Sequence, residues 1–539
     1  MSAPGEQEAG HPAPNGIGES PAGIVETAVP GESAGAFARN SILSISRVLV
    51  TALIAIVLPA YLTHRLPVVT YAAWVLILQV SAYVAYLDFG IQSGISKYVA
   101  EFQARNDPEG SSMRASAGLA LMLITSLLGV ALTLVLAWQV PRLFNEMPPT
   151  LYRDVRFSII FVGISVSFGL LCSIFSSIFF GLQRFAVPII LSIANRILYT
   201  AVVVAAVALH QGLAVMGALV AVVNIATGVL QFEAWRRLAK TVRLSLYGLN
   251  MDVVRKMLVY CSSLAIWTAG MLCVSGLDVT IVGKYDFSQT AFYSIATLPT
   301  NLVTALLGAA LAPLMPTASA LSVHRSPDQM GVVLSRATRY ASTILVTTGI
   351  PLLVAGYWVL RLWVGPVYAM HTIQFLRILV LANILRNMGM PYASMLVATE
   401  SQRIAIAGAV AEAAVNVACS LYLVRHIGAI GVAYGTLIGS FVSIGVHFTV
   451  NMHFTRPKFA ISRARLFMAG LGRPALIAIP SLILVRYWWS NSAPAFGLPA
   501  WFAWGLSSAL LACFAGLTAE ERHGLVRLAS TRLQDACKI

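Results

Sequence analysis

Four ionisable side chains lie inside long apolar stretches of this sequence. They are Arg196, Asp278, Arg386 and Glu412. A charge at the centre of a membrane-spanning helix costs roughly 2.5–3.5 kcal/mol on insertion scales, so it usually faces a cavity or a partner. Two cations and two carboxylates in such positions predict binding of an anion and of a cation.

Amide side chains accompany these charges. Asn195 precedes Arg196, and the spacing of Asn383, Arg386 and Asn387 places all three on one helical face. We predict Asn195, Arg196, Asn383, Arg386 and Asn387 as substrate-binding residues, and Asp278 and Glu412 as ion-coupling residues. Two other interpretations stay open: a structural ion pair between Arg196 and Glu412, and an interfacial position for Asp278.

About fourteen apolar stretches must position these residues, each long enough to cross a bilayer as a helix. The predicted spans are 42–62, 70–92, 115–138, 157–180, 186–208, 212–234, 257–283, 288–312, 338–360, 372–398, 404–424, 427–451, 471–488 and 498–517. The chain is 58% hydrophobic and 11% charged, with a mean hydropathy of +0.79. The fold class is therefore an all-α integral membrane protein.

The positive charge of the chain lies mainly in alternate loops. With the N-terminus in the cytoplasm, the inner segments hold roughly 25 Lys and Arg, the outer loops roughly 8 and the spans roughly 3. We therefore expect both termini to be cytoplasmic. The net charge of +15 then reflects topology and anionic headgroups and does not indicate nucleic-acid binding.

Short motifs recur after about 220 residues, at equivalent loops. Gln183-Arg184 matches Gln402-Arg403, and His210-Gln-Gly has a counterpart in His426-Ile-Gly. A period of six spans preserves orientation, so the repeats would be parallel, and Glu412 would stand where Arg196 stands in the first repeat. Two similar lobes facing a cavity are the architecture of an alternating-access transporter.

The predicted organisation has five parts. They are a disordered cytoplasmic tail (1–36), an N-lobe of six helices (37–243), a C-lobe of six helices (244–455), two extra helices (456–519) and a cytoplasmic C-terminal tail (520–539). The first part contains five Glu and no Lys or Arg, and it lacks the pattern of a signal peptide.

Motifs typical of enzymes and metal sites are missing from the sequence. There is no Walker loop, no zinc-spaced His and Glu set, no nucleophile elbow and no paired cysteine spacing. We expect no catalytic residues, no bound metal and no cofactor, apart from a coupled proton or sodium ion. The short outer loops also disfavour a membrane glycosyltransferase or polymerase.

Several stretches resemble the polysaccharide flippases of the multidrug/oligosaccharidyl-lipid/polysaccharide (MOP) exporter superfamily. The resemblance spans about residues 40–455. It rests on Leu58-Pro59 with Thr70-Tyr-Ala-Ala-Trp74, Leu87-Asp-Phe-Gly90, Gly181-Leu-Gln-Arg-Phe185, Asp278-Val-Thr-Ile-Val-Gly283 with Tyr293-Ser-Ile-Ala296, Leu362-Trp-Val-Gly365, and Gly428-Ala-Ile-Gly-Val-Ala-Tyr-Gly-Thr436. Glu400-Ser401 departs from the glycine that often precedes this Gln in the family.

The resemblance implies a flippase that moves an undecaprenyl-pyrophosphate-linked oligosaccharide to the outer leaflet for surface polysaccharide synthesis. The expected location is the cytoplasmic (inner) membrane. Expected partners are the polyprenyl-linked glycan, membrane lipids and polysaccharide polymerase or assembly proteins. Arg196 and Arg386 would face the pyrophosphate. A multidrug or cation antiporter of the MATE type and a lipid II flippase are the alternatives.

Overall fold

The computed structural model describes residues 34–247, 249–323, 326–399 and 401–472, together with Pro474, Leu506 and His523. Every secondary-structure element in these ranges is a helix, which confirms the all-α class. Among the described residues, 11 helical segments are long and apolar enough to cross a membrane. Most of the thirteenth and fourteenth predicted spans and most of both predicted tails lie outside the described residues.

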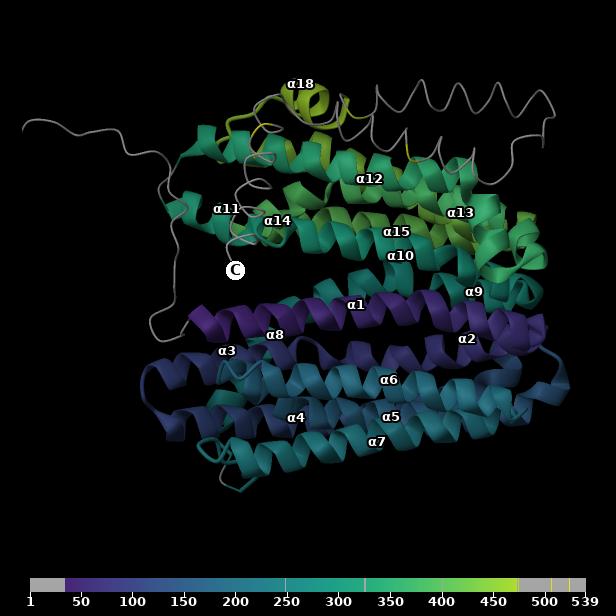
Figure 1. Ribbon diagram of the computed structural model, residues 1–539. Coiled ribbons are helices and arrows are strands. Elements are labelled where there is room, and N and C mark those ends of the chain that lie inside the picture. The colour runs from purple at the N-terminus through teal and green to yellow at the C-terminus, as the bar shows by residue number, and fades with distance from the viewer. Residues whose placement is uncertain are drawn as a thin grey trace, which may run out of the picture.

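The first part of the chain forms what we call the N-terminal bundle (Figure 1). Its elements are α1 (Ala34–Arg65), α2 (Val68–Ala82), η1 (Tyr83–Asp88), α3 (Ile91–Ala104), α4 (Pro108–Leu143), α5 (Pro149–Gly181), α6 (Ala186–Ala208) and α7 (Leu213–Leu238). Helix α5 is central, because it contacts α2, α3, α4, α6 and α7. The second predicted span is divided after η1, where Phe89 and Gly90 both have positive φ angles (48° and 77°).

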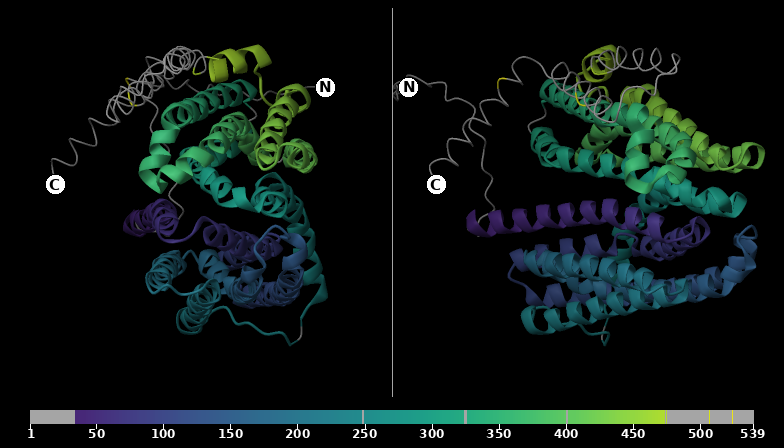
Figure 2. Two further views of the ribbon diagram at one scale, coloured as in Figure 1. Left: turned by 90° about the vertical axis from the view of Figure 1, so that its right-hand side faces the viewer. Right: turned by 45° about the vertical axis from the view of Figure 1, so that its right-hand side comes forward.

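The later part forms the C-terminal bundle, which lies above the first in Figures 1 and 2. Its elements are α9 (Asp278–Tyr285), η3 (Phe287–Gln289), α10 (Thr290–Leu311), α11 (Leu314–Val323), α12 (Pro327–Val364), α13 (Pro366–Met388), α14 (Met390–Ala398), α15 (Gln402–Ile427), α16 (Ile430–Val446), η4 (His447–Asn451), α17 (Met452–Thr455), α18 (Arg463–Leu466) and η5 (Phe467–Gly472). Helix α13 contacts α10, α12 and α16.

The seventh predicted span, 257–283, is not one helix. It consists of α8 (Met251–Met271), the π-helical segment η2 (Leu272–Gly276) and the short helix α9. Helix α8 contacts α3 and α4 of the N-terminal bundle as well as α15, and α9 contacts α10, α15 and α16 as well as α2 of the N-terminal bundle. The break therefore lies where the chain passes from one bundle to the other. The division into lobes at residues 243 and 244 stays a prediction.

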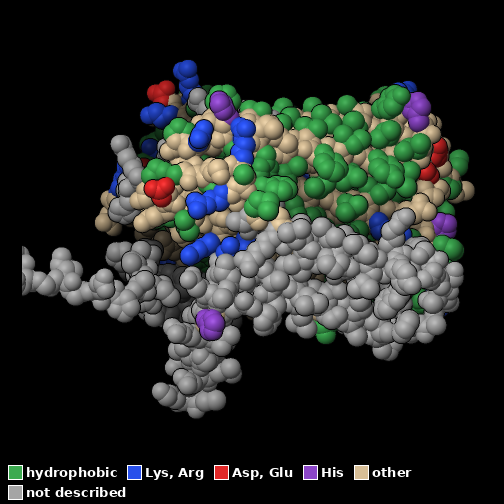
Figure 3. Space-filling model, turned by 90° about the horizontal axis from the view of Figure 1, so that it is seen from above, with side chains coloured by type: hydrophobic (Ala, Val, Ile, Leu, Met, Phe, Trp, Pro, Cys, Tyr) green, Lys and Arg blue, Asp and Glu red, His purple; other side chains and the backbone are tan. Residues whose placement is uncertain are grey.

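Lys and Arg side chains gather at one end of the molecule, which we call the basic end. It carries the turns after α3, α5, α7 and α11, and Figure 3 shows blue side chains concentrated there beside a largely apolar middle. We call the other end, with the turns after α1, α4 and α6, the opposite end. This asymmetry follows the charge alternation expected of cytoplasmic and external loops.

The hydrophobic cores differ between the two ends. At the opposite end one core joins both bundles and includes Tyr71 and Phe144 of the first with Phe292 and Tyr368 of the second. Tyr71 and Tyr368 pack edge to face, with ring centroids 6.0 Å apart. At the basic end there are two separate cores. The core of the N-terminal bundle lies around Ile95 and Ile178, and the core of the C-terminal bundle lies around Leu334 and Leu396. Among the described residues, the core shared by both bundles therefore lies at the opposite end, and α8 also contacts helices of both bundles.

Candidate functional site

Arg386 and Glu412 form an ion pair between α13 and α15. The Nε atom of Arg386 lies 2.5 Å from Oε1 of Glu412, and the side chains are 22% and 6% exposed. The alternative pair between Arg196 and Glu412 is therefore wrong, because Glu412 is already neutralised within its own bundle. The Nη2 atom of Arg386 is buried without a hydrogen-bond partner among the described residues.

The two asparagines beside Arg386 bind another helix. Asn383 donates from Nδ2 to Oγ1 of Thr304 on α10 at 2.7 Å, and Asn387 donates to the same oxygen at 3.2 Å. The predicted common face is thus divided: the amides are directed at α10 and the guanidinium at α15. The amides hold α13 against α10 and leave only Arg386 for other contacts.

Asp278 is buried at the start of α9, where it is 6% exposed. Its Oδ2 atom accepts from the hydroxyls of Thr436 on α16 (2.9 Å) and Tyr293 on α10 (3.3 Å). Nearby on α15, Ser420 donates to Oδ1 of Asn416 at 3.1 Å. A carboxylate surrounded by hydroxyl oxygens is suited to binding a proton or a hard cation.

His447 is a neighbour of Glu412 that sequence reasoning missed. It lies in the π-helical segment η4, is 9% exposed and interacts electrostatically with Glu412. Its Nδ1 atom lies 3.0 Å from Nδ2 of Asn451, one turn away. The sequence feature that could have indicated this site is the spacing of His447 and Asn451, four residues apart within a predicted span. Histidine is unusual inside a membrane span.

The N-terminal bundle contains a network of neutral side chains centred on Asn195. Asn195 donates from Nδ2 to Oγ1 of Thr227 (2.9 Å) and to Oδ1 of Asn224 (3.3 Å), both on α7. Asn224 in turn donates to Oγ of Ser165 on α5 at 3.0 Å. These residues line a cavity of about 340 Å³. The predicted binding residue Asn195 therefore lies at the edge of a pocket.

Arg196 is not part of this network and is exposed. It lies one turn before Tyr199, with which it interacts electrostatically. Tyr199 lines a second cavity, of about 370 Å³, between α1, α2 and α6 of one bundle and α9 and α10 of the other. The structure thus places Arg196 near the space between the bundles and does not bring it to Arg386 or Glu412.

A hydrogen-bonded link crosses between the bundles next to Asp278. The carbonyl of Gly276, at the end of the π-helical segment η2, accepts from Nε2 of Gln79 at 2.7 Å and from the hydroxyl of Tyr83 at 3.0 Å. Tyr83 also shares a hydrogen bond with Thr280. The irregular backbone of η2 leaves this carbonyl available, and the N-terminal bundle satisfies it.

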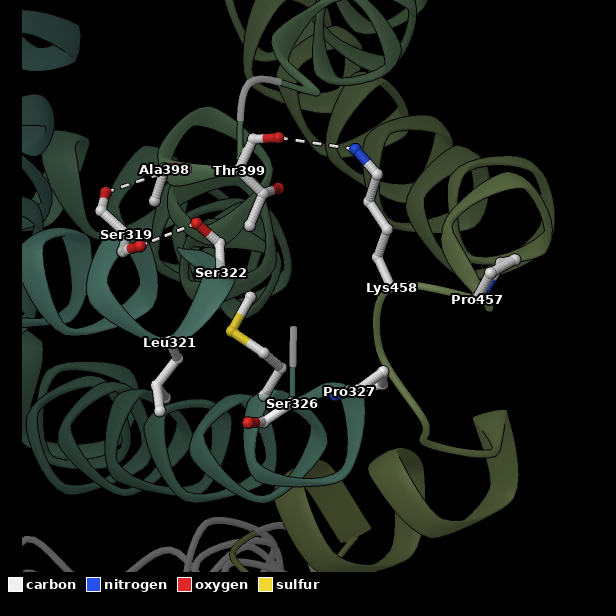
Figure 4. Close-up of a pocket in the computed structure, with 10 residues that line it drawn as sticks. Ser319, Leu321, Ser322, Ser326, Pro327, Ala398, Thr399, Pro457 and Lys458 are labelled. Atoms are coloured by element: carbon white, nitrogen blue, oxygen red, sulfur yellow. Dashed lines mark hydrogen bonds between the residues drawn. The ribbon is translucent and has the colours of Figure 1, made fainter. Parts of the chain in front are cut away.

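A third cavity, of about 660 Å³, lies at the basic end of the C-terminal bundle. Figure 4 shows Lys458 reaching across it toward Thr399, and Nζ of Lys458 lies 2.6 Å from Oγ of Ser401. Ser319 and Ser322 on α11 are bonded to nearby carbonyls. None of the predicted site residues lines this cavity, and its polar groups largely satisfy one another.

Solved structures share this arrangement of helices. An inward closed conformation of the lipid II flippase MurJ superposes with a TM-score of 0.66 at 13% identity, covering 88% of this chain and 98% of that one. An inward-facing multidrug resistance MATE family transporter of the MOP superfamily gives 0.60 at 17% identity, covering 78% and 99%. The chain has the fold of MOP-superfamily transporters.

A further transporter with the MOP fold comes from Pyrococcus furiosus and is described as having a binding pocket of reversed polarity. It superposes with a TM-score of 0.53 at 17% identity and covers 78% of this chain and 96% of its own. No protein-family model and no curated protein matches this sequence. A shared fold does not by itself give a function, so both the function and the substrate must be argued from the residues of this chain.

Proposed function

We propose that this chain is an alternating-access flippase that exports an undecaprenyl-pyrophosphate-linked oligosaccharide across the cytoplasmic membrane for surface polysaccharide synthesis. The observation that carries the proposal is the distribution of the cores. One core joins the bundles at the opposite end, and each bundle has a separate core at the basic end. Two rigid bodies joined at one end can rock, which exposes a site between them to alternate sides.

The charges near the membrane centre support an anionic cargo. Arg196 is exposed and interacts electrostatically with Tyr199, which lines the cavity between the bundles, and a guanidinium suits the oxygens of a pyrophosphate. Of the two carboxylates, Glu412 is paired with Arg386 and Asp278 is buried among hydroxyls. A site for cationic drugs would instead require an acidic side chain that faces the cavity. The balance of charge therefore favours the lipid pyrophosphate over a cation.

Outward movement of the cargo is favoured by the membrane potential and by ion coupling. A doubly charged anion leaving a negative interior gains about 4–5 kcal/mol per 100 mV, at roughly 2.3 kcal/mol per charge. Asp278, with its surrounding oxygens, and Glu412 are our candidates for carrying a counter-moving proton or sodium ion. Asp278 lies two residues after Gly276, the acceptor of the link from the N-terminal bundle, so ion binding there is suited to controlling closure.

A lipid II flippase is the second candidate. It is favoured by one observation, the match to MurJ over 88% of this chain, compared with 78% for the MATE transporters. Both flippase candidates share an undecaprenyl-pyrophosphate carrier, and they differ in the attached glycan.

Deletion of the gene, followed by mass spectrometry of lipid-linked sugars, tests these candidates. We expect one undecaprenyl-linked glycan to accumulate on the cytoplasmic side, and a plasmid copy to reverse this. Accumulation of lipid II would instead support the second candidate. An unchanged lipid profile together with new drug sensitivity would contradict both and favour a multidrug exporter.

A further inference from the structure

The cavity around Asn195 in the N-terminal bundle has features of a built binding site. It lies between α5, α6 and α7, with η1 and α3 beside it, and its volume is about 340 Å³. That volume falls within the range of small-molecule sites, which is about 300–1,000 Å³. The described residues that line it include two Asn, two Gln, three Ser and one Thr, but no Lys, Arg, Asp or Glu.

The network on one wall holds its amides in fixed orientations. Asn195, Asn224 and Ser165 form a chain of hydrogen bonds across α6, α7 and α5. The side-chain amide nitrogen of Asn195 donates to Thr227 and Asn224, and its Oδ1 atom stays available as an acceptor. Gln231 and Ser192 line the same cavity and have no side-chain hydrogen bond to any described residue. The pocket therefore offers unused donors and acceptors beside a fixed scaffold.

The open wall of the cavity is formed by Gly169 of α5. A Cβ atom at this glycine would meet no other atom within 4 Å, whereas at Gly228, on the facing helix, it would meet Phe168 at 2.7 Å and Cys172 at 2.9 Å. Gly228 is required for close helix packing. Gly169 has no such packing role, and its missing side chain leaves the cavity unfilled.

The chemistry of the lining limits what the cavity can bind. A cation would need a carboxylate, and a phosphate would need a cation or several converging N–H groups. A lipid tail would bury unpaired amides at a cost. A sugar ring presents neutral hydroxyls that both donate and accept, which matches Asn, Gln, Ser and Thr side chains. We propose that this cavity binds an uncharged sugar of the cargo.

This inference rests on the proposed function and makes it more specific. Asn195 and Arg196 are adjacent on α6, with the amide at the sugar pocket and the guanidinium near the space between the bundles. One cargo molecule could thus place its pyrophosphate at Arg196 and its first sugars in the pocket. The glycan at this position would then be neutral, since an acidic sugar would find no cation there.

The test measures binding to the purified full-length protein in lipid nanodiscs. The two probes are undecaprenyl pyrophosphate and the same lipid carrying a neutral disaccharide. We expect the wild-type protein to bind the disaccharide lipid at least tenfold more tightly. Gly169→Leu fills the pocket, and we expect it to reduce this preference to less than twofold while affinity for undecaprenyl pyrophosphate is unchanged.

Two further variants make the test decisive. Gly445→Leu is the matched control, because Gly445 is also a helical glycine with no atom within 4 Å of a Cβ but lines a different, apolar hollow. We expect it to keep the full preference. Gln231→Met removes one unused amide at nearly constant size, and we expect at least a threefold loss of preference, which provides a second measurement if Gly169→Leu fails to fold.

The outcomes separate the two proposals. If the wild-type protein binds neither lipid, both the proposed function and the proposed sugar site are wrong. If the wild-type protein binds both lipids equally, or if Gly169→Leu and Gln231→Met keep the preference, the lipid carrier is still a ligand but the sugar site is overturned.

Discussion

Arg386 on α13 and Glu412 on α15 neutralise each other inside the C-terminal bundle, at 2.5 Å between Nε and Oε1. The sequence places these residues 26 positions apart in separate spans, with no local spacing that links them. Their pairing gives the C-terminal bundle a buried polar centre, with Asp278 and His447 nearby. The exposed charge of Arg196 remains in the other bundle.

We expect removal of one partner of this pair to destabilise the protein. Glu412→Leu leaves the largely buried Arg386 without its ion-pair partner, which typically costs about 3–5 kcal/mol. The double variant Arg386→Met/Glu412→Leu should recover much of this loss, because both charges are then absent. Thermal unfolding in detergent of the two single variants and the double variant measures the coupling energy between Arg386 and Glu412. If the losses of the single variants simply add in the double variant, the pair does not behave as described.

Ion coupling should depend on Asp278. Asp278→Asn keeps the size of the side chain but removes the charge that accepts from Thr436 and Tyr293. We expect transport of the lipid-linked glycan by this variant to lose its dependence on the proton or sodium gradient. Glu412→Gln is made in parallel. Uptake assays in liposomes at several pH and sodium values measure this dependence. If Asp278→Asn behaves as wild type, Asp278 is not the coupling residue.

The link from Tyr83 to Gly276 should stabilise the state in which the opposite end is closed. Tyr83→Phe removes a hydrogen bond worth about 0.5–1.5 kcal/mol, which corresponds to roughly a two- to twelvefold change in population. Spin labels at Lys240 and Arg456, both exposed at the basic end, report the separation of the bundles. In Tyr83→Phe we expect a larger fraction of molecules to show a short distance between the two labels. The control Tyr422→Phe alters an exposed tyrosine and should leave the distances unchanged.

Close packing of α5 and α7 should not tolerate a methyl group at Gly217. A Cβ atom there would lie 2.8 Å from the Cα atom of Ser158, which is backbone and cannot move aside. We expect Gly217→Ala to cost about 1–3 kcal/mol through overpacking. Gly169→Ala, in the open wall of the sugar pocket, should instead be neutral or stabilising by up to about 1 kcal/mol. Gly217→Ala should therefore melt at a lower temperature than Gly169→Ala. The reverse order of melting temperatures would contradict this packing.

The orientation in the membrane can be tested by labelling. In a cysteine-free background, we expect a cysteine at Arg65, exposed at the opposite end, to react with an impermeant maleimide added to intact cells. A cysteine at Lys240, exposed at the basic end, should react only after permeabilisation. The reverse pattern would show that the N-terminus is outside and that the proposed direction of export is wrong.

The apolar spans were predictable from the sequence because burial in lipid requires about twenty apolar residues in a row. Eleven helical segments of the described chain satisfy this requirement, and they coincide with predicted spans. The seventh span differs, since periodicity and hydropathy do not reveal the π-helical turn at Leu272–Gly276. Such a break depends on partners elsewhere, here Gln79 and Tyr83, which satisfy the freed carbonyl.

The sequence by itself determined that Arg196, Asp278, Arg386 and Glu412 needed partners or a cavity, because a charge in a span is costly wherever the helix packs. Only the tertiary structure decided which of them meet. Contacts between helices depend on the rotation of each helix about its axis, and packing sets that rotation. Glu412 therefore pairs with Arg386, and Arg196 stays exposed in the other bundle, next to Tyr199.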